Sequence, residues 1–153
     1  MQADRLDAYQ AAPAAMKALI AVETYIQHSG LEGSLIELVK MRASQINGCA
    51  YCLAVHSADA RRNGESEQRL YLLSAWHESS AYTPRERAAL GWTDTLTRVA
   101  DTHAPDSAYD AVREHFSDKE IADLTTLIGM INLWNRLAIG LRYRHPPVEA
   151  AAA

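Results

Sequence analysis

Residues 37–56 form the most informative stretch of the chain, which reads Glu-Leu-Val-Lys-Met-Arg-Ala-Ser-Gln-Ile-Asn-Gly-Cys-Ala-Tyr-Cys-Leu-Ala-Val-His. Apolar residues recur at helical spacing up to Asn47-Gly48, a pair that is typical of a helix end. A second helix is predicted to begin near Cys49 and to end at Asn63-Gly64. Helices joined by so short a connection are expected to pack as antiparallel neighbours, with both cysteines in the first turn of the second helix.

The rest of the chain also predicts helices. Their start and stop signals place them at residues 13–30, 33–47 and 66–80, from Thr83, from a cap at Asp106, and from Ser117 to Pro146-Pro147. Capping boxes are predicted at Thr83 and Ser117, where a glutamate follows three residues later. No stretch alternates apolar and polar residues over the length of a strand. The sequence therefore predicts an all-α fold, a helical bundle of about seven helices.

Length and composition restrict the kind of protein. The 153 residues are 48% hydrophobic and 22% charged, which is typical of a single globular domain spanning residues 1–153. The formal net charge of −4 argues against a nucleic-acid partner. The uncharged stretch 124–135 is shorter than the roughly 20 residues of a membrane span, and the first residues do not resemble a secretory signal. We expect a cytoplasmic protein with no membrane or nucleic-acid partner.

The two cysteines and His56 form the candidate reaction centre. On a helix Cys49, Cys52 and His56 stand at i, i+3 and i+7, so all three are expected on one face. The first turn of a helix stabilises a thiolate, and a histidine one turn later can accept the thiol proton. In a reducing cytoplasm such a pair is redox-active or metal-binding rather than a structural disulfide.

Two other interpretations of these residues remain open. The cysteines can be small buried side chains, since free cysteine is among the most buried residue types. Cys49, Cys52, His56 and Glu37 can also supply four zinc ligands, although the second Cys or His pair usual in such sites is missing. We expect neither a metal nor a cofactor.

Glu37 has two competing roles. It precedes Cys49 on the neighbouring helix, where its carboxylate can orient His56 or take a proton through it. The residues Ser34-Leu35-Ile36-Glu37 also match a capping box, in which the glutamate only reaches back to the amide of Ser34.

Together, Glu37, residues 40–52 and His56 resemble the signature of the alkylhydroperoxidase D core of the carboxymuconolactone decarboxylase-like superfamily. The resemblance covers about residues 35–100 and is clearest over residues 35–73. It implies an all-helical fold that assembles as a homo-oligomer, a trimer or a hexamer. One departure is Tyr51, because the best-studied peroxidases of the family have a histidine immediately before the second cysteine.

The resemblance also implies an activity, that of a cysteine-based thiol peroxidase with an antioxidant role. Cys52 would attack an organic hydroperoxide, and Cys49 would form a disulfide with it and exchange with the reductant. His56 and Glu37 would relay protons. The reductant would be a dithiol, such as a lipoyl protein or a thioredoxin-like protein.

Alternative functions use the same cysteines without peroxide. One is a thiol–disulfide exchange protein, and another is a redox-sensing oligomer in which the pair switches assembly. Polar residues inside the last apolar helix, Asn132, Asn135 and Arg136, suggest either a subunit interface, an approach to the active site, or contacts with loop backbone. Because the bundle is short, we expect it to complete its core against a second copy.

Overall fold

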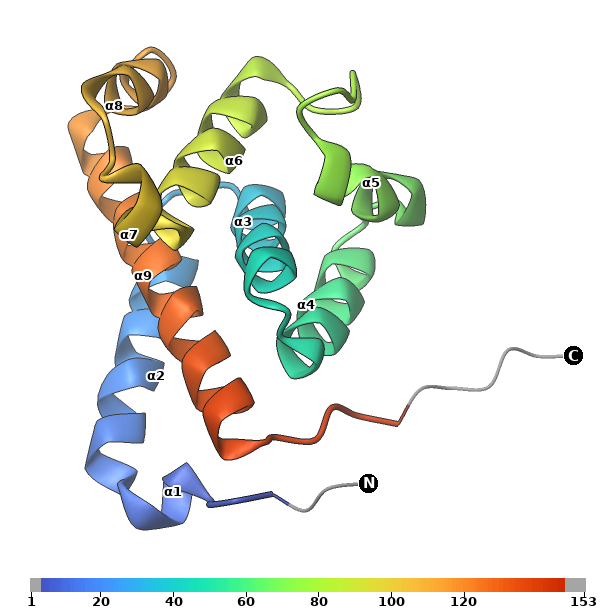
Figure 1. Cartoon of the computed structure of the whole chain (residues 1–153), viewed down its shortest axis with the longest axis vertical. Coiled ribbons are helices and arrows are strands. Elements are labelled where there is room, and N and C mark those ends of the chain that lie inside the picture. Colours follow the sequence, from blue (N-terminus) through green and yellow to red (C-terminus); the bar gives the residue numbers. More distant parts are fainter. Residues whose placement is uncertain (1–3, 148–153) are drawn as a thin grey trace, which may run out of the picture.

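The computed structural model describes residues 4–147. Within that range the chain forms nine α-helices, one 3-10 helix and no strand (Figure 1). The α-helices are α1 (Ala8–Ala11), α2 (Pro13–Gln27), α3 (Gly33–Asn47), α4 (Ala50–Arg62), α5 (Glu67–Leu72), α6 (Pro84–Thr97), α7 (Val99–Thr102), α8 (Asp106–Arg113) and α9 (Asp118–Leu141). The prediction of an all-α fold is confirmed. Its seven helices correspond to the longer ones, and the single-turn helices α1 and α7 are additional.

Helix α3 is the central element of the bundle. Figure 1 shows it between α4, α6 and α9, and it packs against all three. Every residue from Leu35 to Ser44 is buried, so this segment has no solvent-facing side. One apolar cluster joins α3 to α2, α6, α8 and α9, and a second joins it to α4, α5 and α6. The position of α3 therefore determines where the other helices lie.

Helix α9 is the second main element of the core. By length and composition it is the one helix in the described part of the chain that could cross a membrane. In the structure it packs along α2, α3 and α6 and buries side chains from Ile121 to Ala138. We therefore describe it as the core helix that the sequence predicts.

Several predicted helix ends are confirmed. Gly48 ends α3 in the left-handed conformation with φ 68°, and Cys49 is the N-cap of α4. Both predicted capping boxes are complete, at the starts of α6 and α9, where Thr83 and Ser117 accept hydrogen bonds from the N–H groups of Glu86 and Glu120. These ends depend on local hydrogen bonds and backbone conformation, which is why the sequence predicts them well.

The predicted capping box at Ser34 is wrong. Helix α3 begins at Gly33, as the predicted range 33–47 has it, whereas a cap at Ser34 would place the first helical residue at Leu35. Ser34 therefore already lies inside the first turn, and Glu32 is the N-cap. The Glu32 carboxylate is bound by Arg85 and makes no cap hydrogen bond. The cap predicted at Asp106 is also wrong, because Pro105 has the extended backbone of the N-cap and Asp106 is the first residue of α8.

Three helices end before their predicted positions. Helix α2 ends at Gln27 rather than at residue 30. Helix α5 ends at Leu72 and continues only as the 3-10 turn Leu73–Ala75, because Arg87 binds the carbonyl oxygens of Trp76, His77 and Ser79 outside a helix. Helix α9 ends at Leu141 rather than at Pro146. There Arg142 adopts a left-handed conformation, and Arg5 donates hydrogen bonds to the carbonyl oxygens of Gly140 and Leu141.

The two serines give a first prediction. Ser117→Ala removes a side-chain cap and is expected to lower the free energy of unfolding by about 1 kcal/mol. Ser34→Ala removes only an exposed hydroxyl without a cap role, so its effect is expected within about 0.5 kcal/mol. Urea unfolding of both variants checks this, and equal losses would show that Ser34 caps α3 after all.

Glu120 gives a second prediction, about pH. The N–H of Ser117 and the Arg85 guanidinium hold the pKa of Glu120 at about 2, below its ordinary 4.5. Because this pKa is lowered on folding, the stabilisation is fully present above pH 4.5 and is lost as the pH falls toward 2. The difference in unfolding free energy between the wild type and Glu120→Gln should shrink over that window. A constant difference would contradict the assignment.

Candidate active site

Cys49 and Cys52 form a disulfide at the start of α4. Their Cα atoms are 5.4 Å apart, with Cys49 at the N-cap and Cys52 in the first turn. The Cys49 Sγ also accepts a hydrogen bond from the backbone N–H of Cys52 at 3.3 Å. One N–H of this helix end, that of Cys52, therefore points at the Cys49 sulfur, which in the reduced protein favours a thiolate.

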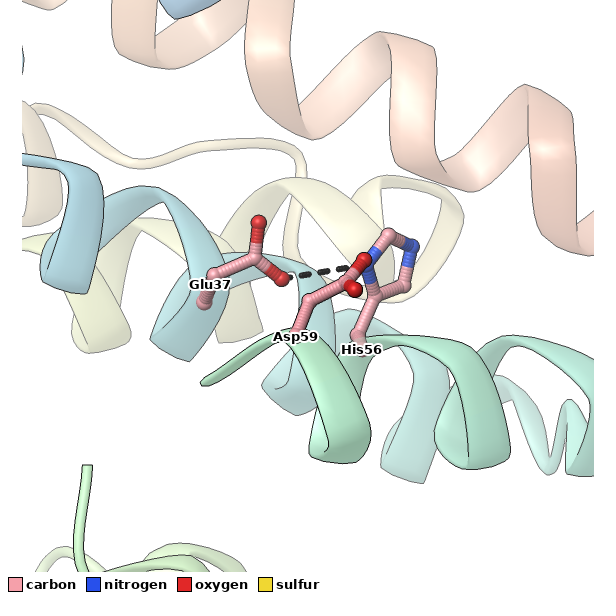
Figure 2. A group of neighbouring side chains, drawn as sticks. All are labelled: Glu37, His56 and Asp59. Carbon is pink, nitrogen blue, oxygen red and sulfur yellow. Dashed lines mark hydrogen bonds and ion pairs between the residues drawn. The ribbon is translucent and has the colours of Figure 1, made fainter. Parts of the chain in front are cut away.

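Glu37 on α3 and His56 on α4 are in direct contact. The Glu37 Oε2 lies 3.1 Å from the His56 Nδ1, and Figure 2 shows the carboxylate facing the imidazole across the gap between the two helices. Glu37 is 6% exposed and makes this contact rather than a helix cap. When the carboxylate accepts the Nδ1–H, the other nitrogen, Nε2, is the one free to accept a proton.

A buried lysine, Lys40, lies behind this pair. It is 2% exposed, forms an ion pair with Glu23 of α2, and places its Nζ 3.8 Å from the Glu37 Oε1. A buried carboxylate is costly unless a positive charge compensates it, and Lys40 supplies that charge between two carboxylates. Our sequence analysis missed this residue. The spacing of Glu37 and Lys40, one helical turn apart in an apolar helix, is the signal that could have found it.

Asp59 is a second residue that the sequence analysis missed. Ligand atoms of Glu37, His56 and Asp59 lie within 4.8 Å of one another (Figure 2). Carboxylates and imidazole can bind divalent cations, but Glu37 is already bound by His56 and Lys40, and Asp59 is paired with Arg62 at 3.0 Å. The four-ligand set weighed from the sequence does not assemble here, because its two cysteines are bonded to each other.

A pocket of about 270 Å³ opens beside Cys52 and His56. Its wall consists of Tyr9, Ile20, Glu23, Tyr51, Cys52, Val55, His56, Trp134, Ala138 and Tyr143. Cys49 is 1% exposed and is not part of this wall. The predicted shared face therefore holds for Cys52 and His56, which face the pocket together, whereas Cys49 lies behind them.

The polar residues of α9 bind α3 within the same chain. The Asn47 side chain donates to Asn132 at 2.9 Å and to Asn135 at 2.8 Å, and Asn135 donates to Ser44 at 3.0 Å. The two asparagines therefore need neither loop backbone nor a subunit interface. Arg136 is exposed and donates only to Asn132 on α9 itself, so the interface alternative for Arg136 stays a prediction. Because Asn47 is the last residue of α3, this network fixes the turn that leads into Cys49.

Comparison with known proteins places these residues in a family context. Residues 8–95 match the model of the carboxymuconolactone decarboxylase family. The uncharacterized Bacillus subtilis protein YdfG is 41% identical over 140 residues, which are 92% of this chain and 95% of YdfG.

Solved structures show the same fold. An Agrobacterium tumefaciens protein of unknown function, suggested to be the antioxidant defence protein AhpD, has 50% identity and a TM-score of 0.92, with 95% of this chain and 100% of that chain covered. A peroxidase-related Ralstonia eutropha protein with an alkylhydroperoxidase AhpD core has 22% identity and a TM-score of 0.79. That match covers 90% of this chain and 74% of the other.

Lys40 gives a third prediction. Lys40→Met leaves Glu37 buried without its compensating charge, and we expect it to lower the free energy of unfolding by about 3 kcal/mol. Lys17→Met, at an exposed position of α2, is the matched control and is expected within about 0.5 kcal/mol of the wild type. Urea unfolding of both variants is the measurement. Similar small losses would mean that Lys40 does not compensate Glu37.

Proposed function

Since the chain belongs to the carboxymuconolactone decarboxylase family and has the fold of the alkylhydroperoxidase D core, we propose that it is a thiol-dependent peroxidase with an antioxidant role. The resemblance of residues 37–56 is thus confirmed for family and fold. One observation carries the proposal: Cys52 and His56 share a pocket wall, and Glu37 holds His56 from behind. The substrate proposed is an organic hydroperoxide.

The first step uses Cys52, because it is the cysteine that faces the pocket. His56 takes the thiol proton at Nε2, and the Cys52 thiolate attacks the terminal oxygen of the hydroperoxide. The O–O bond breaks, Cys52 becomes a sulfenic acid, and the alkoxide takes a proton from His56 to leave as the alcohol. Glu37 stabilises the imidazolium that exists between these proton transfers.

The second step uses Cys49. Its sulfur attacks the Cys52 Sγ, a disulfide forms, and the hydroxyl of the sulfenic acid leaves as water after taking a proton. The N–H that binds the Cys49 sulfur supports its thiolate form. The product of this step is the disulfide described above.

An outside dithiol completes the cycle. Its two thiols supply two electrons and two protons to the disulfide and become a disulfide themselves. We propose a lipoyl protein or a thioredoxin-like protein for this role, exchanging with Cys49. Because Cys49 is 1% exposed, the exchange requires the first turn of α4 to open.

We further propose that the protein is a cytoplasmic homo-oligomer, a trimer or a hexamer. Large apolar side chains on the outside of α2 and α9, namely Ile20, Tyr25, Leu133 and Ile139, are between 38% and 52% exposed and support a contact with a second copy. Light scattering gives the mass in solution, and a monomer in both redox states would overturn this part of the proposal.

Peroxide reduction gives a fourth prediction. Stopped-flow mixing of the reduced protein with cumene hydroperoxide is expected to show consumption that Cys52→Ser abolishes. His56→Asn should lower the rate about 10²–10⁴-fold, the usual contribution of general acid–base catalysis. The matched control is His103→Asn. It changes an exposed histidine whose backbone is left-handed, a conformation that asparagine tolerates, so the rate should stay unchanged.

The peroxidase proposal would be overturned if the reduced wild type consumed cumene hydroperoxide no faster than the Cys52→Ser variant does. Turnover of a lipoyl or thioredoxin-type dithiol without peroxide would then indicate a thiol–disulfide exchange protein. A change of mass between the reduced and oxidised forms, again without peroxide turnover, would indicate a redox-sensing oligomer.

A further inference from the structure

Both sulfur atoms of the cysteine pair belong to side chains that are almost fully shielded from solvent. Cys49 is 1% exposed and Cys52 is 3% exposed. Together with Ala138 of α9 they form a small apolar cluster, against which Tyr51 and Tyr143 pack. A hydroperoxide reaches Cys52 through the pocket, whereas a dithiol has to bring two sulfur atoms of its own to the disulfide. The residues that cover the pair therefore matter most for its reduction.

Two segments that are distant in the sequence form part of this cover. Figure 1 shows the segment after α9 passing between the start of α4 and the first described residues. This segment carries Tyr143, whose ring meets that of Tyr51 edge-on with centroids 5.7 Å apart. The buried hydroxyl group of Tyr143 faces the backbone of Ala8 in α1. Tyr143 is thus held between the cysteine cluster and α1, and we call residues 4–8 and 141–145 the Tyr143 cover.

Few contacts fasten the Tyr143 cover, and they lie at the surface. The guanidinium of Arg5 donates to the carbonyl oxygen of Gly140 at 3.0 Å, and its backbone N–H donates to that of Leu141 at 2.9 Å. Asp4 and Arg144 form an ion pair at 3.3 Å, with both side chains more than half exposed. Exposed ion pairs and single hydrogen bonds contribute little to stability, so such a segment opens at a lower free energy than the core does.

The turn between α3 and α4 also borders the pair, but it belongs to the rigid core. The backbone N–H of Cys49 donates to the carbonyl oxygen of Ser44 at 3.0 Å, and Ser44 is fully buried. The Asn47 side chain binds Asn132 and Asn135 of α9. Separating these groups would leave buried polar atoms unpaired, which costs more than releasing exposed contacts. Opening at the first turn of α4 therefore begins with release of the Tyr143 cover.

We infer that the Tyr143 cover is a gate for the reducing half of the cycle. It stays closed while a hydroperoxide oxidises Cys52 through the pocket, and it opens to admit the dithiol to the disulfide. The inference rests on the proposed function and adds the step that controls access of the reductant.

The chemistry behind the open gate is a thiol–disulfide exchange. One thiolate of the dithiol attacks the Cys49 Sγ and forms a mixed disulfide, and the Cys52 sulfur leaves as a thiolate that takes a proton. The second thiol of the dithiol then attacks its own partner sulfur in the mixed disulfide, which releases Cys49 as a thiol. The dithiol supplies both electrons and both protons and leaves as a disulfide.

The rate at which dithiothreitol reduces the oxidised protein tests the inference without peroxide. Samples are quenched with excess N-ethylmaleimide in urea, and mass spectrometry gives the reduced fraction. Arg144→Gln removes the ion pair with Asp4 and is expected to raise the rate about two- to fivefold. Arg5→Ala removes the side-chain bond to Gly140 and should raise it about two- to tenfold. Tyr143→Ala removes the covering side chain and should raise the rate at least as much.

The matched control is Arg61→Gln, which breaks an ion pair of similar exposure at the other end of α4. Arg61 is 58% exposed and pairs with Glu67, whereas Arg144 is 57% exposed. The control should leave the rate of reduction unchanged. Unchanged rates in Arg144→Gln, Arg5→Ala and Tyr143→Ala would overturn the inference, because dithiothreitol would then reach the disulfide through the pocket.

Urea below the unfolding transition separates a local gate from global unfolding. Local opening exposes little surface, so the rate of reduction of the wild type should depend only weakly on urea. A slope as steep as that of global unfolding would overturn the gate, and this measurement requires no variant to fold.

The outcome separates from that of the proposed function. Arg144→Gln should leave the first turnover of the reduced protein with cumene hydroperoxide unchanged, because oxidation uses the pocket. Faster reduction of the cover variants without any hydroperoxide consumption would keep the gate and reject the peroxidase. Hydroperoxide consumption with unchanged rates of reduction would do the reverse.

Discussion

The four buried polar side chains of α3 are the constraint on which the bundle depends. Burying a polar side chain is costly unless it is paired, and α3 pairs each of these four with a different helix. The pairs are Glu37 with His56 of α4, Lys40 with Glu23 of α2, Arg42 with Asp94 of α6, and Ser44 with Asn135 of α9. The buried Oε1 of Gln45, near the end of α3, has no hydrogen-bond partner. Apolar packing alone would tolerate a rotation or a shift of α3, whereas these pairs specify one position.

The candidate active site includes one of these four pairs, that of Glu37 with His56. His56 is oriented because α3 must satisfy Glu37, so the geometry of the imidazole follows from the folding of the core. The network of Asn47, Asn132 and Asn135 does the same for the cysteines, since it fixes the end of α3 and hence the start of α4. Rigid support of this kind keeps reactive groups in place without any dedicated loop.

The sequence predicts features that depend on neighbouring residues, and it misses features that depend on contacts between distant parts of the chain. The helix ends at Gly48, Thr83 and Ser117 could be predicted because they depend on backbone conformation and on hydrogen bonds to residues at most a few positions away. The end of α9 at Leu141 depends instead on Arg5, which is 135 residues from the Gly140 carbonyl that it binds. The choice between the two roles of Glu37 likewise required His56 of another helix. Spacing brought Cys52 and His56 together on α4, but the part of the pocket wall formed by Trp134, Ala138 and Tyr143 could not be inferred, because the sequence of α9 and of the segment after it carries no motif.

The attachment of the first described residues to the end of α9 has a consequence for how such a site can change. Arg5 holds the carbonyl oxygens of residues 140 and 141, and Asp4 pairs with Arg144 at 3.3 Å, so Tyr143 lies in a segment fastened by exposed contacts at the edge of the bundle. Such contacts open at a lower free energy than the core does. Substitutions there change part of the pocket wall at little cost to the fold, whereas substitutions in the buried part of α3 cost stability. Substrate preference and cysteine chemistry can therefore diverge separately among descendants of one ancestor.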